Sequence, residues 1–296
     1  MNTVQATIYG AKLLVAVLLG QTPTIDAKST MNERLEIQDD ARPTATEQVK
    51  LGILVAGNKG HTSSIGNNGV AKTSIVDHFA DNASLYGPVP MAMRATDDDF
   101  PLASRNKYAL RKELLIDGVN YYAYYGLRID VSKADVPIVM KKITIEDGIV
   151  TETVFVPDTS NLYPVPIPLP SSGAVTTTDV KLAVSALLPV VLSMTDVEEY
   201  VNVSKIMNGG DEEYAIMSEF GLCTGADRAI TVQTTSGTAT FIESIGTQIY
   251  AFAADHKALY YNEQELTLQF DVGNQIPMLG TQSIPTLQTI GTTGTV

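Results

Sequence analysis

Residues that carry reactive chemistry are scarce in this sequence. Its 296 residues include one cysteine, Cys223, three histidines and no tryptophan. A single cysteine excludes an intrachain disulfide and a metal site built on cysteines. Because Cys223 follows an apolar stretch that ends at Leu222, we expect an inert core residue and not a nucleophile.

Charge is also scarce, and it is mostly negative. Charged residues make up 18% of the chain against 44% hydrophobic residues, and 33 acidic side chains oppose 20 basic ones, giving a net charge of -13. This excess repels phosphate backbones, so we expect no general binding of nucleic acid. We interpret the basic group Arg105, Lys107, Arg111 and Lys112 as a solvated strand face. A lightly charged surface suits a protein that covers much of itself against neighbours.

Long hydrophobic runs are missing as well. The run from Leu13 to Leu19, which follows Lys12, resembles the core of a signal peptide, but it is short and no A-x-A cleavage site follows it. It is also too short to span a bilayer, so we expect no membrane partner. The run predicts a buried helix or strand.

Turn signals are the clearest local pattern. Asp117-Gly118 separates two strand-like runs, 107–116 and 119–130, and Asp147-Gly148 separates two more, 136–146 and 149–156. Asp-Gly between strands is typical of a type I′ hairpin, which needs positive φ at both positions. We expect two tandem hairpins that form one antiparallel meander of about four strands.

The other expected elements are mostly strands. A helix is predicted at 29–40 with a Ser or Thr cap, and a second short helix begins at the N-cap Thr195 and stops at Asn208-Gly209-Gly210. The strands and turns expected elsewhere are a strand pair within 174–193 with an edge or bulge at Pro189, a hairpin at 230–245 that turns at Ser236-Gly237, and strands at 248–253 and 265–272. The fold class is therefore α+β, dominated by antiparallel β hairpins, with a few short helices and extended arms.

The chain divides into four parts by composition. Residues 1–160 hold the N-terminal α+β region, 161–173 a proline-rich connector, 174–271 a second β-rich region and 272–296 a C-terminal arm. Alternating prolines keep the connector out of a central strand. The arm has no charged residue, and its apolar positions are Ile276, Met278, Leu279, Ile284, Leu287 and Ile290. We expect this arm to dock on its own domain or on a neighbouring copy.

One stretch suggests nucleotide binding. Residues 66–73 match the phosphate-loop pattern G-x-x-x-x-G-K-T except that Ala71 replaces the second glycine. A phosphate loop leaves a buried strand and opens a helix. The preceding apolar run, 51–56, ends well before Gly66 with loop composition between, so we favour a Gly/Asn/Ser loop for subunit contacts. A phosphate-loop-like enzyme that uses Lys72 is the alternative.

Other candidate chemistry has less support. Asp97, Asp98 and Asp99 could supply oxygen ligands to a divalent cation, but they lack the spacing of an EF-hand and read as a solvated loop. Neither H-E-x-x-H nor G-x-S-x-G occurs, and each histidine is interpreted as a surface or locally satisfied residue. A glycosidase with paired carboxylates is a further alternative. We assign no catalytic, cofactor-binding or metal-binding residue.

The tandem Asp-Gly hairpins, the alternating prolines of 162–170 and the neutral C-terminus resemble structural proteins of large tailed bacteriophages. The resemblance implies a non-enzymatic virion protein, present in several copies in the neck, tail or baseplate and assembled in the host cytoplasm. Its partners would be copies of itself and other virion proteins, with no cofactor or small-molecule substrate. A capsid decoration protein is a closely related alternative. A secreted or surface adhesin that uses the Tyr-rich strands is a separate alternative, and it would require export.

Overall fold

A computed structural model of the chain describes residues 4–38, 40–67, 69–131, 136–157, 180–234, 237–260 and 265–277. The chain forms two compact units, each built from separate stretches of sequence. Unit 1 contains Met1–Lys133 and Pro189–Phe270, and unit 2 contains Ala134–Leu188 and Asp271–Val296. The expected division into consecutive regions therefore differs from the folded units, because the chain leaves unit 1 and later returns to it.

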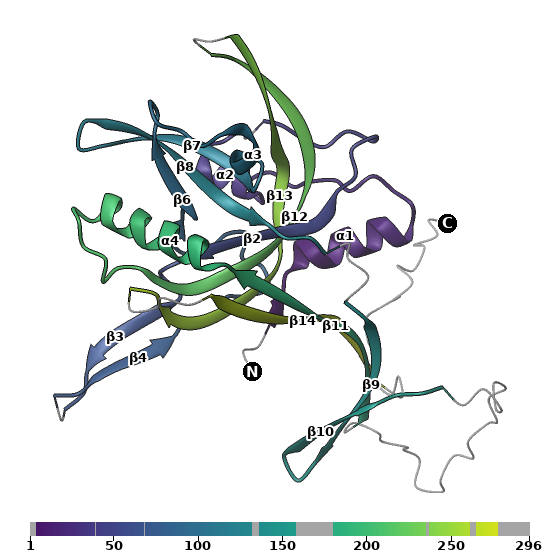
Figure 1. The fold of residues 1–296 in the computed structure, drawn as a ribbon. Helices are drawn as coiled ribbons and strands as arrows, with labels where there is room; N and C mark the ends of the chain where they lie inside the picture. The colour runs from purple at the N-terminus through teal and green to yellow at the C-terminus, as the bar shows by residue number, and fades with distance from the viewer. Residues whose placement is uncertain are drawn as a thin grey trace, which may run out of the picture. The chain divides into compact units, whose positions relative to one another are not determined.

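Unit 1 is built on a large antiparallel sheet with the strand order β1-β13-β12-β2-β8-β6 (Figure 1). In addition, β5 pairs with β2 and β7 pairs with β8. The strands of this sheet are β1 Val4–Ala6, β2 Lys50–Gly57, β5 Pro88–Val89, β6 Ala92–Ala95, β7 Tyr108–Ile116, β8 Val119–Arg128, β12 Ile216–Thr234 and β13 Gly237–Ala258. Two further strands, β3 His61–Ile65 and β4 Ala71–Ile75, form a separate hairpin.

The longest strands, β12 and β13, form one hairpin whose register ends at Thr234 opposite Gly237. The hairpin expected at 230–245 is thus confirmed, although its strands extend much further and Gly237, expected in the turn, is the first residue of β13. The strand expected at 248–253 is part of β13. The register shifts at three places between Met217 and Ala226. Such bulges bend a strand and increase its twist, which lets one long pair pack on both α1 and β2.

Both Asp-Gly hairpins are confirmed. Asp117 and Gly118 have φ of 50° and 80°, and Asp147 and Gly148 have φ of 51° and 79°. These positive values at both central positions are those of a type I′ turn. The first turn joins β7 to β8, and the second joins β9, Ile138–Glu146, to β10, Ile149–Val154.

The single meander expected from these two hairpins is wrong, because they belong to different sheets. Both edges of β8 are occupied, one by β7 and the other by β6 and β2, so β9 has no place beside it. Instead β9 pairs with β11, Val180–Leu192, in a four-stranded sheet of order β10-β9-β11-β14. Strand β14, Leu266–Pro277, completes this sheet.

Strand β11 also corrects the strand pair expected within 174–193. Val180–Leu192 is one continuous strand, and Pro189 lies beyond Ala186, the last residue of β11 that pairs with β9. Proline has no N–H to donate, so it is tolerated where that pairing has ended. Strand β14 confirms the strand expected at 265–272 and shows that the first residues of the expected arm, 272–277, are strand. The connector at 161–173 and the rest of the arm lie outside the described residues.

Four helices occur in the described part of the chain: α1 Ile8–Leu18, α2 Met31–Leu35, α3 Leu102–Arg105 and α4 Met194–Met207. Helix α2 starts at a Thr30–Glu33 capping box as expected, but it ends far short of residue 40 because Glu36 is left-handed, with φ of 56°. Ser193, not Thr195, caps α4, since Asp196 completes a capping box with it. Gly209 and Gly210, both with positive φ, follow the end of α4 as expected.

The core of unit 1 lies between its large sheet and the helices and loops that cover it. The largest fully buried side chains are Met31, Leu54, Leu85, Met91, Met93, Leu110, Tyr124, Leu192, Tyr200, Met217, Phe220 and Phe252. Cys223 is also fully buried, and burial raises the pKa of its thiol, so the expectation of an inert core cysteine is confirmed.

Candidate assembly interface

Helix α1 is held against β13 by its first turn (Figure 1). The Thr7 hydroxyl caps the helix by accepting a hydrogen bond from the N–H of Gly10, at 3.0 Å, and it donates to the carbonyl of Ile249 at 2.6 Å. A Cβ on Gly10 would lie 2.7 Å from Cδ2 of Tyr250 and 2.8 Å from its carbonyl oxygen. Only glycine permits this close approach of the helix to the strand.

The outward face of α1 is apolar. Ile8, Val15 and Leu18 recur at helical spacing and are 58%, 55% and 84% exposed, and Leu14, Val17 and Leu19 beside them are exposed too. Gly10 is the only buried residue of the helix. The sequence correctly indicates an apolar element here, but the expected burial is wrong within this one chain. Six large apolar side chains together in the open are the kind of patch that marks a contact surface.

A groove runs beside α1. It has a volume of about 380 Å³ and lies between the helix, the segment 21–24 and Gln248. Lys12 is the only charged side chain among the described residues that line it, and its Nζ lies 2.8 Å from each carboxylate oxygen of Asp26. The groove therefore presents apolar and neutral polar groups with its one charge already paired.

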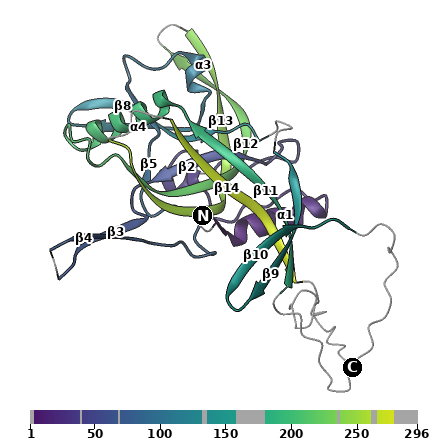
Figure 2. The same cartoon turned by 60° about the horizontal axis from the view of Figure 1, so that its bottom comes forward.

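The β3–β4 hairpin is a second surface with exposed apolar residues, and it projects from the rest of unit 1 (Figures 1 and 2). Ile65, Val70 and Ile75 are exposed along it. Lys72 lies within β4 opposite Ser64, and the next element described after this strand is β5 and not a helix. The strand-loop-helix geometry of a phosphate loop is therefore not formed at residues 66–73, which corrects the Lys72 alternative at the level of structure.

A buried carboxylate fixes the base of this hairpin. Glu219 on β12 accepts backbone N–H groups from Lys59 at 3.2 Å, Tyr86 at 2.8 Å and Gly87 at 2.7 Å. The Nε2 of His78 lies 3.0 Å from its Oε2, and both side chains are fully buried. Burial raises the pKa of the Glu219 carboxyl, but His78 and the three backbone groups outweigh it, so its pKa lies below the ordinary value.

The three histidines of the chain all lie close to this base. The ring of His78 stacks between Tyr86 and Phe252, with centroid distances of 4.3 and 4.2 Å. The ring of His61, the first residue of β3, meets the ring of His256 on β13 edge-on at 4.7 Å. Burial and the neighbouring His256 lower the pKa of His61, against the opposing effect of Glu219. Within the described residues no group of three or more His, Cys, Asp or Glu side chains could hold a metal ion.

The family described as Family of unknown function (DUF7208) matches residues 1–287. The chain belongs to this family. No curated protein and no solved structure gives a significant match to it. The description of this family names no activity and no partner.

Unit 2 of this DUF7208 chain exposes apolar residues on its sheet. Ile138 and Met140 on β9 share one face with their partners on β11, Ala186 and Val184, and of these Ile138, Met140 and Val184 are exposed. Every residue of β10, the edge strand, is exposed. A domain usually buries such a face against a second layer, so this sheet is a third surface suited to a neighbour.

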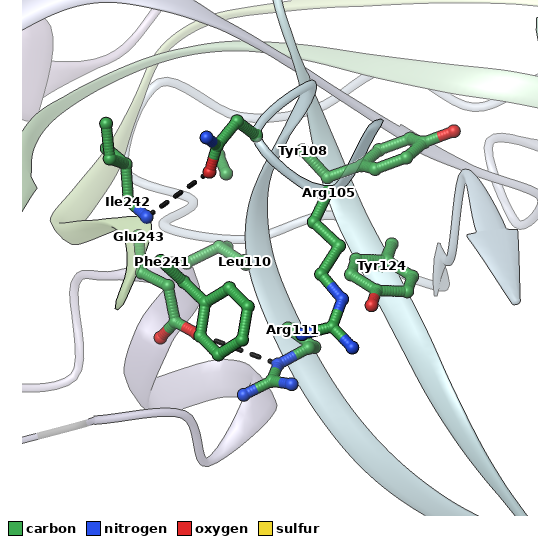
Figure 3. A pocket seen from close by; sticks show the side chains of 10 residues that line it. Arg105, Tyr108, Leu110, Arg111, Tyr124, Phe241, Ile242 and Glu243 are labelled. Carbon is green, nitrogen blue, oxygen red and sulfur yellow. Dashed lines mark hydrogen bonds and ion pairs between the residues drawn. The ribbon is translucent and has the colours of Figure 1, made fainter. Parts of the chain in front are cut away.

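The predicted basic strand face is a paired cluster and not a solvated one. Arg105 and Arg111 approach the ring of Phe241, with guanidinium carbons 4.5 and 4.9 Å from its centroid (Figure 3). Arg105 pairs with Asp99, and Arg111 Nε lies 3.7 Å from an oxygen of Glu243. Lys107 and Lys112 pair with Asp196 and Glu36. This arrangement ties β7 to β13.

The cavity beside this cluster is small. Its volume of about 10 Å³ is room for roughly one water molecule. Asp99 also accepts a hydrogen bond from the Tyr124 hydroxyl, so one of the three carboxylates considered for a cation is engaged by protein groups.

No helix in the described part of the chain is long and apolar enough to cross a membrane.

Proposed function

We propose that this chain is a non-enzymatic structural subunit of a tailed-bacteriophage particle, present in several copies in the neck, tail or baseplate. Its partners are other copies of itself and other virion proteins. The observation that carries the proposal is the exposed apolar face of α1, with Ile8, Val15 and Leu18 at its centre.

The apolar side chains of α1 need a cover. A helix that is hydrophobic all round belongs in a core. Fully covering a Val, Leu or Ile side chain contributes roughly 1.5 to 3 kcal/mol. Ile8, Val15 and Leu18 are held outward by the close contact of Gly10 with Tyr250, so a neighbouring molecule is what can cover them.

The exposed hairpins support a repeated assembly. The β3–β4 hairpin and the sheet that contains β9 and β10 are separate from the α1 face. Like that face, they expose apolar side chains. Several separate contact surfaces on one subunit favour heterologous contacts, in which one surface meets a different surface of the next copy. Contacts of this kind close into rings when the rotation permits it, and rings are what a neck, tail or baseplate requires.

The test is the mass of the full-length protein in solution. Size-exclusion chromatography with light scattering, over a wide range of concentrations, should show a multimer for the wild type and a monomer for the double variant Val15→Asp with Leu18→Asp. The matched control is Gln48→Glu with Asn120→Asp, which adds the same charge at two exposed polar positions. It should stay multimeric.

Two outcomes contradict the proposal. One is a wild-type chain that is monomeric at every concentration, and the other is a Val15→Asp, Leu18→Asp variant as multimeric as the wild type. Electron microscopy of the multimer tests its form: closed rings of uniform size support a virion role, and irregular aggregates count against it.

A further inference from the structure

We propose that the groove along α1 binds the C-terminal segment 278–296 of a second copy of this chain. The inference rests on the proposed function, since it names the part of the neighbour that covers α1.

The groove selects for a neutral occupant. Its single lining charge, Lys12, is held by both carboxylate oxygens of Asp26 at 2.8 Å. A charged occupant would lose its hydration without gaining a partner there. The volume of about 380 Å³ lies within the range of roughly 300 to 1,000 Å³ that is usual for clefts that bind a small ligand. A few apolar side chains on an extended strand would therefore fill it.

Residues 278–296 have the matching chemistry. The segment has no charged side chain, while the chain as a whole has a net charge of -13. Two copies therefore repel each other least when they meet through this segment and a groove whose charge is already paired. Proline and the repeated Gly and Thr residues disfavour a helix there.

The spacing and length also match. Ile284, Leu287 and Ile290 recur every third residue, and Pro285 follows the first of them. An extended chain with three residues per turn places all three side chains on one edge and spans about 19 Å from Ile284 to Ile290, at 3.1 Å per residue. Helix α1 lines the groove from Ile8 to Ala16, about 12 Å at 1.5 Å per residue. Two neighbouring apolar side chains of the segment, about 9 Å apart, therefore fit within the groove, and the third lies beyond its end.

Cross-linking of full-length chains tests the occupant directly. One preparation carries Val15→Cys, a second, distinguishable by a tag, carries Leu287→Cys, and the mixture is treated with a short bismaleimide. The native Cys223 is fully buried and does not compete. We expect a cross-linked pair that contains both chains. The control Ala45→Cys, at an exposed loop position, should give no such pair with Leu287→Cys.

A third preparation carries Val15→Cys and Leu287→Cys in one chain. Three results would overturn the inference. They are a cross-link within single chains of this double variant but none between chains, no cross-link at all, or an Ala45→Cys control that links as well as Val15→Cys. The first of these would make the segment an occupant of the groove of its own chain.

Two negative charges added to the segment distinguish a failure of this inference from a failure of the proposed function. Leu287→Asp with Ile290→Asp should raise the concentration needed for self-association by at least about tenfold. The matched control, Thr292→Asp with Thr293→Asp, adds the same charge to polar positions of the same segment and should leave it unchanged. If the α1 variant dissociates the multimer and the Leu287, Ile290 variant does not, assembly through α1 stands and the segment as its occupant is wrong. If neither does, both are wrong.

Discussion

Helices α1 and α4 both pack on unit 1, yet they turn opposite kinds of side chains to the outside. Helix α4 buries Val197, Tyr200 and Val203 at helical spacing and exposes polar residues such as Glu198 and Lys205. It has an acidic residue in its first turn and a basic one in its last, as the helix dipole favours. Helix α1 buries only Gly10 and has no charged residue in either end turn.

This contrast shows which parts of the fold are complete within one chain. The apolar stripe of α4 is covered by its own unit, and its Arg94–Glu199 and Lys107–Asp196 ion pairs fix its orientation. The described residues leave the outward stripe of α1 uncovered. Sequence hydropathy alone ranks α1 as the more deeply buried helix, so the exposed stripe indicates a missing neighbour and not a poorly formed helix.

Removing one tyrosine from each helix should give the greatest difference in stability between them. Tyr200 is 1% exposed and its hydroxyl donates to the carbonyl of Ile216 at 3.1 Å, so Tyr200→Ala should lower the free energy of unfolding by about 3 to 5 kcal/mol. Tyr9 on α1 is half-buried and donates to the carbonyl of Asp81 at 3.2 Å. Tyr9→Ala should cost only about 1 kcal/mol. Urea unfolding followed by circular dichroism measures both, and equal losses would contradict the contrast.

Glu219 on β12 holds two loops by accepting the backbone N–H groups of Lys59, Tyr86 and Gly87. Glu219→Gln should cost on the order of 3 kcal/mol, since it leaves the buried His78 and three backbone N–H groups with a weaker partner. Because the folded-state pKa of Glu219 lies below its ordinary value of 4.5, its stabilisation is full above that pH and is lost as the pH falls through the folded-state pKa.

The acid side of the stability profile checks this sign. Melting temperatures measured from neutral pH downward should fall more steeply below pH 4.5 for the wild type than for Glu219→Gln. The control Glu113→Gln removes an exposed carboxylate and should keep the wild-type steepness. Identical acid limbs for the wild type and Glu219→Gln would show that the carboxylate does not hold these loops.

The sequence was informative wherever a structure depends on neighbouring residues. Asp117-Gly118 and Asp147-Gly148 fixed both hairpins because positive φ is a local requirement. The capping-box rule alone does not choose the cap of α4, because Glu198 stands three residues after Thr195 just as Asp196 stands three residues after Ser193. The structure starts the helix at Met194 and caps it with Ser193, so the predicted cap Thr195 lies inside the first turn.

Long-range pairing was not readable. Nothing near Asp147 tells which sheet its hairpin joins, because the answer depends on β8 being paired along both edges. The approach of His61 to His256 and of His78 to Glu219 depends on the register of strands far apart in sequence. Hydropathy likewise predicted that α1 needs a cover, but it carries no information on which molecule provides that cover.

A valine-to-threonine substitution made in both helices should change stability least. Valine and threonine are nearly the same size, so the change tests mainly whether a hydroxyl enters an apolar environment. Val203 is fully buried, and Val203→Thr should cost about 1 to 3 kcal/mol in unfolding. Val15 is 55% exposed, so Val15→Thr should change the unfolding of the dilute chain by less than about 0.5 kcal/mol while it weakens self-association. If Val15→Thr costs the dilute chain as much as Val203→Thr, the α1 face is covered by its own chain, and the case for a neighbour there is lost.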